Sequence, residues 1–124
     1  MTLRIIFLLV ILALAGCNSD KPKLVAATGK VTFKNQPLTA GSLFFHPESA
    51  SGPAKISSLL QLDGSFAMKT FPHGDGVPPG KYKVTLAPEL AGRIGKPLYG
   101  DPAKTPWTVD VPDGGLSDHT FEVK

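Results

Sequence analysis

Residues 81–87, KYKVTLA, alternate strictly between polar and apolar side chains. Tyr82, Val84 and Leu86 would share one face of an extended chain, and the two lysines and the threonine between them would share the other. Side chains of a β-strand point alternately to opposite faces, so this pattern predicts a strand with one buried face. The stretch therefore favours a sheet that is packed on one side and solvated on the other.

The same alternation recurs on both sides of this stretch, between closely spaced glycines and prolines. No segment is long and periodic enough to predict a helix, and residues 88–105 are expected to form a long loop. Seven short strands at this spacing predict an all-β sandwich or barrel. Their ranges are 29–34, 42–46, 55–62, 65–70, 81–87, 107–111 and 117–123.

Each predicted strand offers an apolar face to a common core, and Asp63-Gly64 predicts a tight hairpin turn between the third and fourth strands. Phe44 is the exception, because it points away from the core face of its own strand. The residues expected to point inward are Val31, Phe33, Leu43, Phe45, Ile56, Leu60, Leu62, Phe66, Met68, Tyr82, Val84, Leu86, Val109, Val111, Phe121 and Val123.

An unbroken apolar run occupies residues 5–15, shortly after Arg4. It is too short to span a bilayer as a helix, which needs about 20 residues. Its length fits the apolar core of a secretory signal peptide, and the alternative is a buried N-terminal strand. The run ends in Leu14-Ala15-Gly16-Cys17, and the composition becomes polar immediately afterwards.

The segment Leu14-Ala15-Gly16-Cys17 resembles the lipobox of bacterial lipoproteins, in which small residues precede the modified cysteine. The resemblance implies cleavage before Cys17 and attachment of a diacylglyceryl group, usually with a third acyl chain. It divides the chain into a signal peptide (1–16), a lipidated cysteine with its tether (17–26) and a domain (27–124). Extended, residues 18–26 reach at most about 30 Å, so the domain would sit close to its membrane.

The lipoprotein resemblance also implies a location. The protein would be secreted across the inner membrane and held by lipid on Cys17, and the membrane would be its first partner. Asn18, rather than aspartate, follows the cysteine, which by resemblance to Gram-negative sorting signals favours the outer membrane or its periplasmic face.

Charge and cysteine content exclude several classes of protein. The chain has thirteen lysines and arginines and ten acidic residues, so its formal net charge is +3. The lysines are scattered without a basic stripe, so nucleic acid is not an expected partner. Cys17 is the only cysteine, so no disulfide is expected within the chain.

Three segments together resemble carboxypeptidase regulatory-like domains: GKVTFKNQPLTAGSLFFHP (29–47), LDGSFAM (62–68) and VPPGKYKVTL (77–86). Small lipoproteins of this type are numerous in planctomycete-like bacteria, where YGDPAKTPWTVDV (99–111) also fits. The resemblance implies a transthyretin (prealbumin)-like β-sandwich of seven strands with Greek-key topology. It does not imply peptidase activity, because such modules accompany catalytic domains or stand alone.

The candidates for catalysis or metal binding are few. His119 and Glu122 are spaced as in a zinc site, but residues three apart on a strand point to opposite faces and do not share a metal. His73 and Asp75 lie in a glycine-rich segment, 71–76, and are candidates for contact with a ligand. Two ligands so close in sequence make a poor metal site, so no metal, cofactor or catalytic residue is expected.

Two functions remain open from the sequence. The first is a non-catalytic, membrane-anchored envelope lipoprotein that acts as a structural or binding module for an envelope protein or glycan. Tyr99, Trp107 and the 88–105 loop are its expected contact surface, because amphipathic aromatic residues in loops suit recognition. For Trp107, a place at the edge of the core is an equally good interpretation. The alternative is a small hydrolase or metal-dependent enzyme that uses His73 and Asp75.

Overall fold

The computed structural model describes residues 23–48 and 55–124. The predicted signal peptide, Cys17 and most of the tether lie outside the described residues. The described part is mostly β, with ten strands, one α-helix and one 3₁₀ helix. The strands are β1 (Ala27–Phe33), β2 (Gln36–Pro37), β3 (Ser42–Pro47), β4 (Lys55–Leu59), β5 (Ser65–Ala67), β6 (Lys69–Phe71), β7 (Gly74–Asp75), β8 (Gly80–Leu86), β9 (Thr108–Val111) and β10 (Leu116–Val123); the helices are α2 (Pro88–Arg93) and η2 (Pro97–Gly100).

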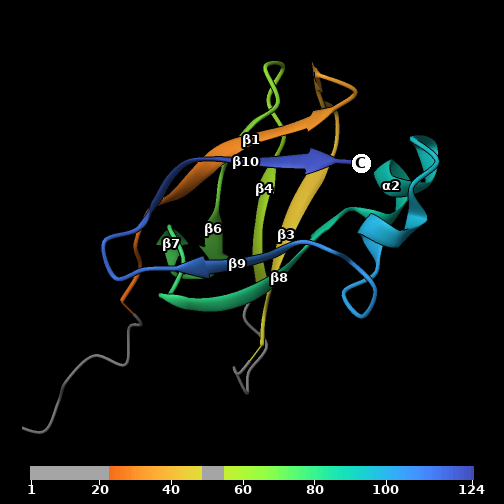
Figure 1. Cartoon of the computed structure of the whole chain (residues 1–124). Coiled ribbons are helices and arrows are strands. Elements are labelled where there is room, and N and C mark those ends of the chain that lie inside the picture. Colours follow the sequence, from red (N-terminus) through yellow and green to blue (C-terminus); the bar gives the residue numbers. More distant parts are fainter. Residues whose placement is uncertain (1–22, 49–54) are drawn as a thin grey trace, which may run out of the picture.

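The strands form two sheets (Figure 1). In the smaller sheet, β1 lies in the centre, parallel to β10 on one side and antiparallel to β2 and β5 on the other. The larger sheet has six strands in the order β7-β6-β4-β3-β8-β9. Every pairing in the larger sheet is antiparallel. This arrangement confirms the predicted all-β class, with ten strands in place of seven.

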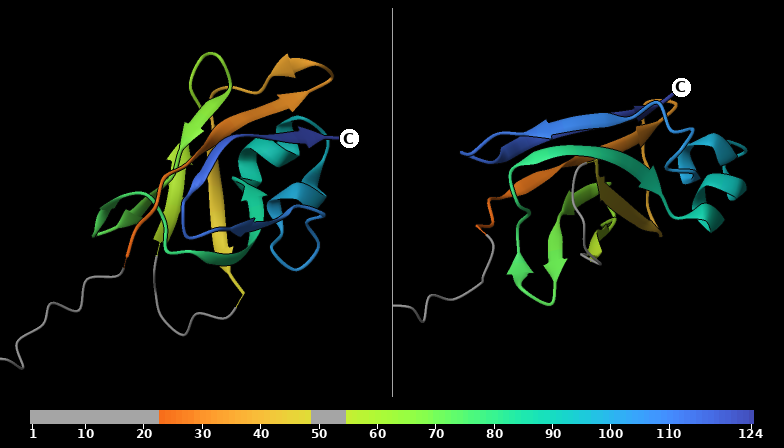
Figure 2. Two further views of the ribbon diagram at one scale, coloured as in Figure 1. Left: turned by 60° about the vertical axis from the view of Figure 1, so that its left-hand side comes forward. Right: turned by 90° about the horizontal axis from the view of Figure 1, so that it is seen from below.

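The two sheets lie face to face, and the core fills the space between them (Figure 2). Aromatic rings connect the layers: Phe45 of the larger sheet lies 6.4 Å from Phe66 and 6.3 Å from Phe121 of the smaller one, between ring centroids. Tyr82 packs against Phe45 at 5.4 Å from the neighbouring strand β8. Burial of such large apolar side chains is the main source of stability for a chain of this size.

The predicted fourth strand, 65–70, is one extended segment shared between the two sheets. Its first part, β5, pairs with β1, and its last part, β6, pairs with β4. Met68 lies at the crossing: its N–H donates to Ala27 O and its carbonyl accepts from Gly76 N–H. The predicted inward positions Phe66 and Met68 are both buried, so the crossing leaves the alternation intact.

The expected loop 88–105 contains α2 and η2, so the prediction of a segment without helices was wrong. Pro88 and Glu89 begin the helix and Leu90 and Ala91 are buried in the core. The helix is only six residues long, too short to show a helical repeat in the sequence. The two helices close one end of the sandwich, beyond the end of β8 (Figure 1).

The predicted core is confirmed with two departures. Leu62 is 92% exposed, because β4 ends at Leu59 and Leu62 lies in the turn that leads to β5. Phe33, near the end of β1, is only partly buried. The other fourteen residues that were predicted to point inward are buried.

Candidate functional site

Tyr99 and Trp107, predicted to form an exposed contact surface, are instead 5% and 9% exposed. Their rings meet edge to face at 4.7 Å, and Trp107 also contacts the ring of Phe121. Trp107 Nε1 donates to Glu122 O, and the Tyr99 hydroxyl accepts from Lys124 N–H at 3.0 Å. These contacts hold η2, β9 and β10 together, so the pair contributes to the core rather than to an open surface.

His73 and Asp75 lie on the hairpin formed by β6 and β7, and both are exposed. The Asp75 carboxylate is 3.8 Å from Lys69 Nζ, and the side chains of this ion pair are 91% and 58% exposed. Exposed pairs of this kind contribute little to stability. Within residues 23–48 and 55–124, no group of three His, Cys, Asp or Glu side chains is placed to hold a metal ion.

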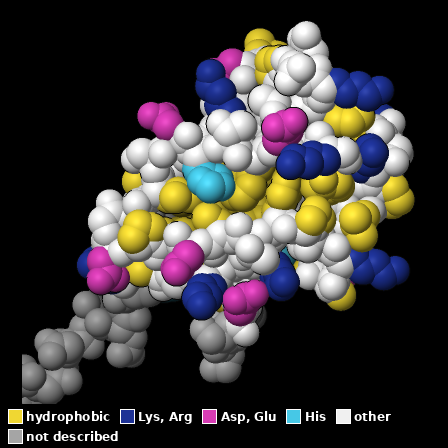
Figure 3. All heavy atoms as spheres, in the orientation of Figure 1, with side chains coloured by type: hydrophobic (Ala, Val, Ile, Leu, Met, Phe, Trp, Pro, Cys, Tyr) yellow, Lys and Arg dark blue, Asp and Glu magenta, His cyan; other side chains and the backbone are white. Residues whose placement is uncertain are grey.

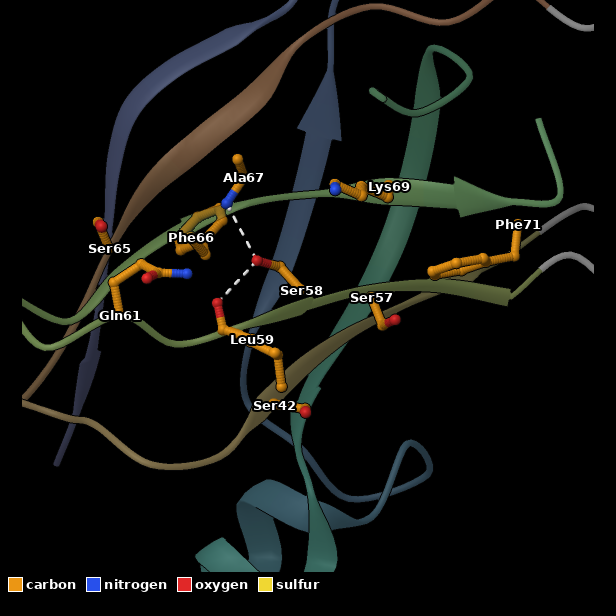
Figure 4. A pocket seen from close by; sticks show the side chains of 10 residues that line it. All are labelled: Ser42, Ser57, Ser58, Leu59, Gln61, Ser65, Phe66, Ala67, Lys69 and Phe71. Atoms are coloured by element: carbon orange, nitrogen blue, oxygen red, sulfur yellow. Dashed lines mark hydrogen bonds between the residues drawn. The ribbon is translucent and has the colours of Figure 1, made fainter. Parts of the chain in front are cut away.

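A groove of about 470 Å³ opens where the 65–70 segment crosses between the sheets, from β5 in the smaller sheet to β6 in the larger one (Figure 4). Phe71 lies at one end, and Gln61 and Ser65 lie at the other. Polar side chains line it together with exposed apolar ones, including Leu59, which is 69% exposed. The lining residues are Ser42, Ser57, Ser58, Leu59, Gln61, Ser65, Phe66, Ala67, Lys69 and Phe71.

The crossing of the chain between the sheets creates this groove. β4 and β6 pair only from Lys55 to Ser57, and beyond that point β5 diverges toward β1. Ser58 bridges the divergence: its hydroxyl donates to Leu59 O at 2.9 Å and accepts from Ala67 N–H at 3.1 Å (Figure 4). A side chain thus replaces the missing backbone ladder, and the floor of the groove remains hydrogen-bonded.

The chemistry of the groove is nearly neutral. Among the described residues that line it, Lys69 alone is charged, and neither a histidine nor a carboxylate is present. Four serine hydroxyls and one glutamine amide supply hydrogen-bond donors and acceptors, while Leu59 and Phe71 supply apolar surface. Such a set suits contact with an uncharged polar ligand rather than proton transfer.

His46 lies on the outer face of the larger sheet, on strand β3, which is adjacent to β4. Its Nε2 atom is hydrogen-bonded to Thr85 Oγ1 at 2.8 Å, and Thr85 is buried. Desolvation by burial lowers the pKa of His46 below its ordinary value, which favours the neutral imidazole. Phe44, which the alternation placed on the face away from the core, lies with its ring 6.4 Å from that of His46 on this face.

Charged side chains of both signs are scattered over the face shown in Figure 3, around a band of hydrophobic side chains. No basic stripe is visible on that face, in agreement with the scattered lysines of the sequence. A stripe of positively charged side chains is the usual surface feature of nucleic-acid-binding proteins.

The groove was not predicted from the sequence. The available signal was Ser58, a polar residue at an inward position between Ile56 and Leu60, followed by Leu59 at an outward position. Ser58 and Leu59 line a groove only because β5 diverges toward β1, and that divergence is a feature of the tertiary structure.

Comparisons with models of protein families, with curated proteins and with solved structures gave no match to this chain. In the part of the chain that the structure describes, none of the helices is long and apolar enough to cross a membrane.

Proposed function

We propose that the protein is a bacterial lipoprotein whose β domain is held at the membrane by lipid on Cys17. Three sequence features support this: the short apolar run 5–15, the Leu14-Ala15-Gly16-Cys17 lipobox and the polar tether that follows. The two-sheet fold beginning at β1 supports a separate domain directly after the tether. We assign it the Greek-key, transthyretin-like type of the carboxypeptidase regulatory-like domains it resembles, and the periplasmic side of the outer membrane as its location.

The domain acts as a binding module, and the groove between β4 and β5 is its contact site. The observation that carries this proposal is the composition of the groove, in which hydroxyl and amide groups lie beside exposed apolar side chains. A neutral envelope glycan offers hydroxyl groups and apolar ring faces that match this surface. Where β5 diverges from β4, Ala67 N–H is already bonded to Ser58 Oγ, which leaves one backbone donor fewer for an added peptide strand.

A non-catalytic role fits this site better than hydrolysis by His73 and Asp75. Both side chains are exposed on the hairpin, and Asp75 is engaged with Lys69. A general base works best when a third group orients it toward the substrate in a site that excludes water. Neither requirement is met by two exposed side chains on a surface hairpin.

The anchor is tested by labelling. Radiolabelled palmitate should enter the protein in cells that process bacterial lipoproteins, and Cys17→Ala should abolish labelling and leave the precursor uncleaved. Label entering the Cys17→Ala variant at the same level would overturn the assignment.

The groove is tested by the binding of the lipidated chain, in detergent micelles, to purified peptidoglycan and to an array of envelope oligosaccharides. Leu59→Lys places a charge in the groove and should weaken binding by about tenfold, the equivalent of about 1.4 kcal/mol. Leu62→Lys is the matched control, because Leu62 is exposed in the nearby turn without lining the groove. Equal binding by both variants, or no glycan bound by the unaltered protein, contradicts the glycan site.

A further inference from the structure

The tether leaves the domain beside the β6–β7 hairpin. Val25 N–H donates to Val77 O and Val77 N–H donates to Val25 O, both at 2.8 Å. Gly76 fits closely against this bridge, because a Cβ atom there would lie 2.6 Å from Val25 O. In Figure 1 the first described residues, drawn in orange, lie next to β7. The end of the sandwich that carries the β6–β7 hairpin is therefore the end nearest to the proposed anchor.

The distance to the anchor is short. Six peptide units separate Cys17 from Lys23, the first described residue. Fully extended, they reach roughly 20 Å. With acyl chains on Cys17 buried in a bilayer, Lys23 stays within that distance of the lipid headgroups. Two residues later, Val25 forms the bridge to Val77 beside the hairpin.

This end of the domain carries an exposed aromatic residue. Phe71 is 52% exposed at the end of β6, although an aromatic ring of its size usually finds cover in the core. Lys55 lies directly opposite it on β4, Lys69 precedes it on the same face of β6, and all three side chains are exposed. Lys23 is a further exposed cation at the exit of the tether.

Aromatic rings and lysines together suit the interface between lipid and water. The ring reaches the boundary of the acyl chains, and the ammonium groups meet lipid phosphates. Asp75 neutralises part of this charge through its contact with Lys69. The apolar ring and the short tether, rather than a strong positive charge, therefore identify the partner as a bilayer.

We propose that the β6–β7 hairpin is a second membrane contact, in which Phe71 enters the lipid interface and orients the domain. The inference rests on the proposed lipid at Cys17, because the exposed ring alone is too small to hold the protein on a membrane. In this orientation the lipid interface takes up the ring of Phe71. The part of the groove with Leu59, Gln61 and Ser65 points away from the bilayer and is the part left open to a ligand.

Two exposed leucines serve as internal controls. Leu62, 92% exposed, lies in the turn beyond the end of β4, whereas the hairpin lies near its beginning. Leu98, 46% exposed, lies in η2, beyond the far end of β8. Both side chains are apolar. The strand pairings place both positions toward the end of the larger sheet that is opposite to the end where β6 pairs with β4.

The test places one fluorescent probe at a time on the full chain. In the lipidated protein Cys17 is acylated, so His73→Cys, Leu62→Cys and Leu98→Cys each offer one free thiol for the environment-sensitive dye NBD. The labelled proteins are reconstituted into vesicles of phosphatidylethanolamine and phosphatidylglycerol that contain spin-labelled lipid headgroups. The dye at position 73 should shift to the blue and be quenched, while the dyes at 62 and 98 should emit as they do in water.

A second variant isolates the contribution of Phe71. In the Phe71→Ser background, quenching of the dye at position 73 should fall by about threefold, because the hairpin loses its apolar contact with the interface. Equal quenching at positions 73 and 62, or quenching at 73 that ignores the Phe71→Ser change, overturns the inference. Mass spectrometry of the same samples distinguishes a failure of this inference from a failure of the proposed anchor. Lipid on Cys17 without quenching at position 73 refutes the orientation alone. Absence of lipid on Cys17 refutes the anchor.

Discussion

A single buried threonine, Thr105, connects β8 to the residue that precedes β9. Thr105 is 6% exposed; its hydroxyl donates to Val84 O at 2.7 Å and accepts from Trp107 N–H at 3.2 Å. These two bonds position Trp107 at the start of β9, where its ring packs on Tyr99 and Phe121. A sequence shows that a threonine is present, but its two partners depend on contacts that only the fold provides.

Thr105→Val should destabilise the domain by about 1–3 kcal/mol. The shape of the side chain is retained, but Val84 O and Trp107 N–H lose their buried partner. Urea unfolding followed by tryptophan fluorescence measures the change. Thr108→Val, at an exposed position of β9, is the control and should change the free energy of unfolding by less than about 0.5 kcal/mol. Equal effects of the two substitutions would rule out the role given to the buried hydroxyl.

Gly29 marks a close approach between β1 and β10. A Cβ atom at this position would lie 1.8 Å from His119 O, far inside contact distance, at a point where the β1–β10 register shifts. Gly29→Ala should therefore cost about 3 kcal/mol or more, because the two strands must separate. Gly92→Ala is the control, since nothing lies within 4 Å of its Cβ position in α2. Thermal unfolding should show a large fall in Tm for Gly29→Ala only, and similar Tm values for the two variants would be inconsistent with the tight approach.

His46 predicts how stability depends on pH. Its pKa is lowered in the folded state by desolvation, so the unfolded state binds a proton more readily. The stabilisation of the neutral imidazole is complete above the unfolded pKa of about 6.5 and is lost as pH falls below it. The urea midpoint should therefore fall more between about pH 7.5 and 5 in the unaltered protein than in His46→Gln. His73→Gln, at an exposed position, should retain the full dependence; an unchanged dependence in His46→Gln would refute the role of His46.

At the scale of elements, the alternation of side chains predicted every long strand, because burial of one sheet face leaves a period of two in the sequence. It did not predict the division of 65–70 between two sheets, since Phe66 and Met68 keep the same period across the crossing. The groove depends on that division and was missed for the same reason. The α2 helix was missed because six residues carry no repeat, and the exposure of Leu62 was missed because the pattern does not mark where β4 ends.

The β1–β2 hairpin shows how a local conformation sets register. Phe33 pairs with Gln36, so Lys34 and Asn35 form a two-residue turn, and both have positive φ, 53° and 62°. Two positive φ values are the mark of a type I′ turn, which favours Asn-Gly. Because lysine seldom adopts positive φ, the sequence gives little sign that the turn begins at Lys34.

The double substitution Lys34→Asn with Asn35→Gly should stabilise the domain by about 0.5–1.5 kcal/mol, because it relieves two left-handed residues in the turn. Asn35→Val should do the opposite, since a β-branched residue tolerates positive φ poorly. Both changes are measured as shifts in the urea midpoint at constant slope. A destabilised double variant would contradict the assigned turn.

At the scale of the whole molecule, the domain is a two-sheet unit with an N-terminal segment that leaves beside the β6–β7 hairpin. The proposed orientation depends on the proposed lipid, and the position of the proposed glycan site above the bilayer depends on that orientation. The groove would present its ligand contacts at a fixed height above the bilayer only if the chain is held there. The lipid on Cys17 is therefore the claim on which the rest depends.

Intact mass spectrometry of the protein purified from a membrane fraction tests that claim most directly. The mature chain should begin at Cys17 and carry a diacylglyceryl group, usually with a third acyl chain, on that residue. A chain that begins at Met1 and has an unmodified thiol at Cys17 would contradict it.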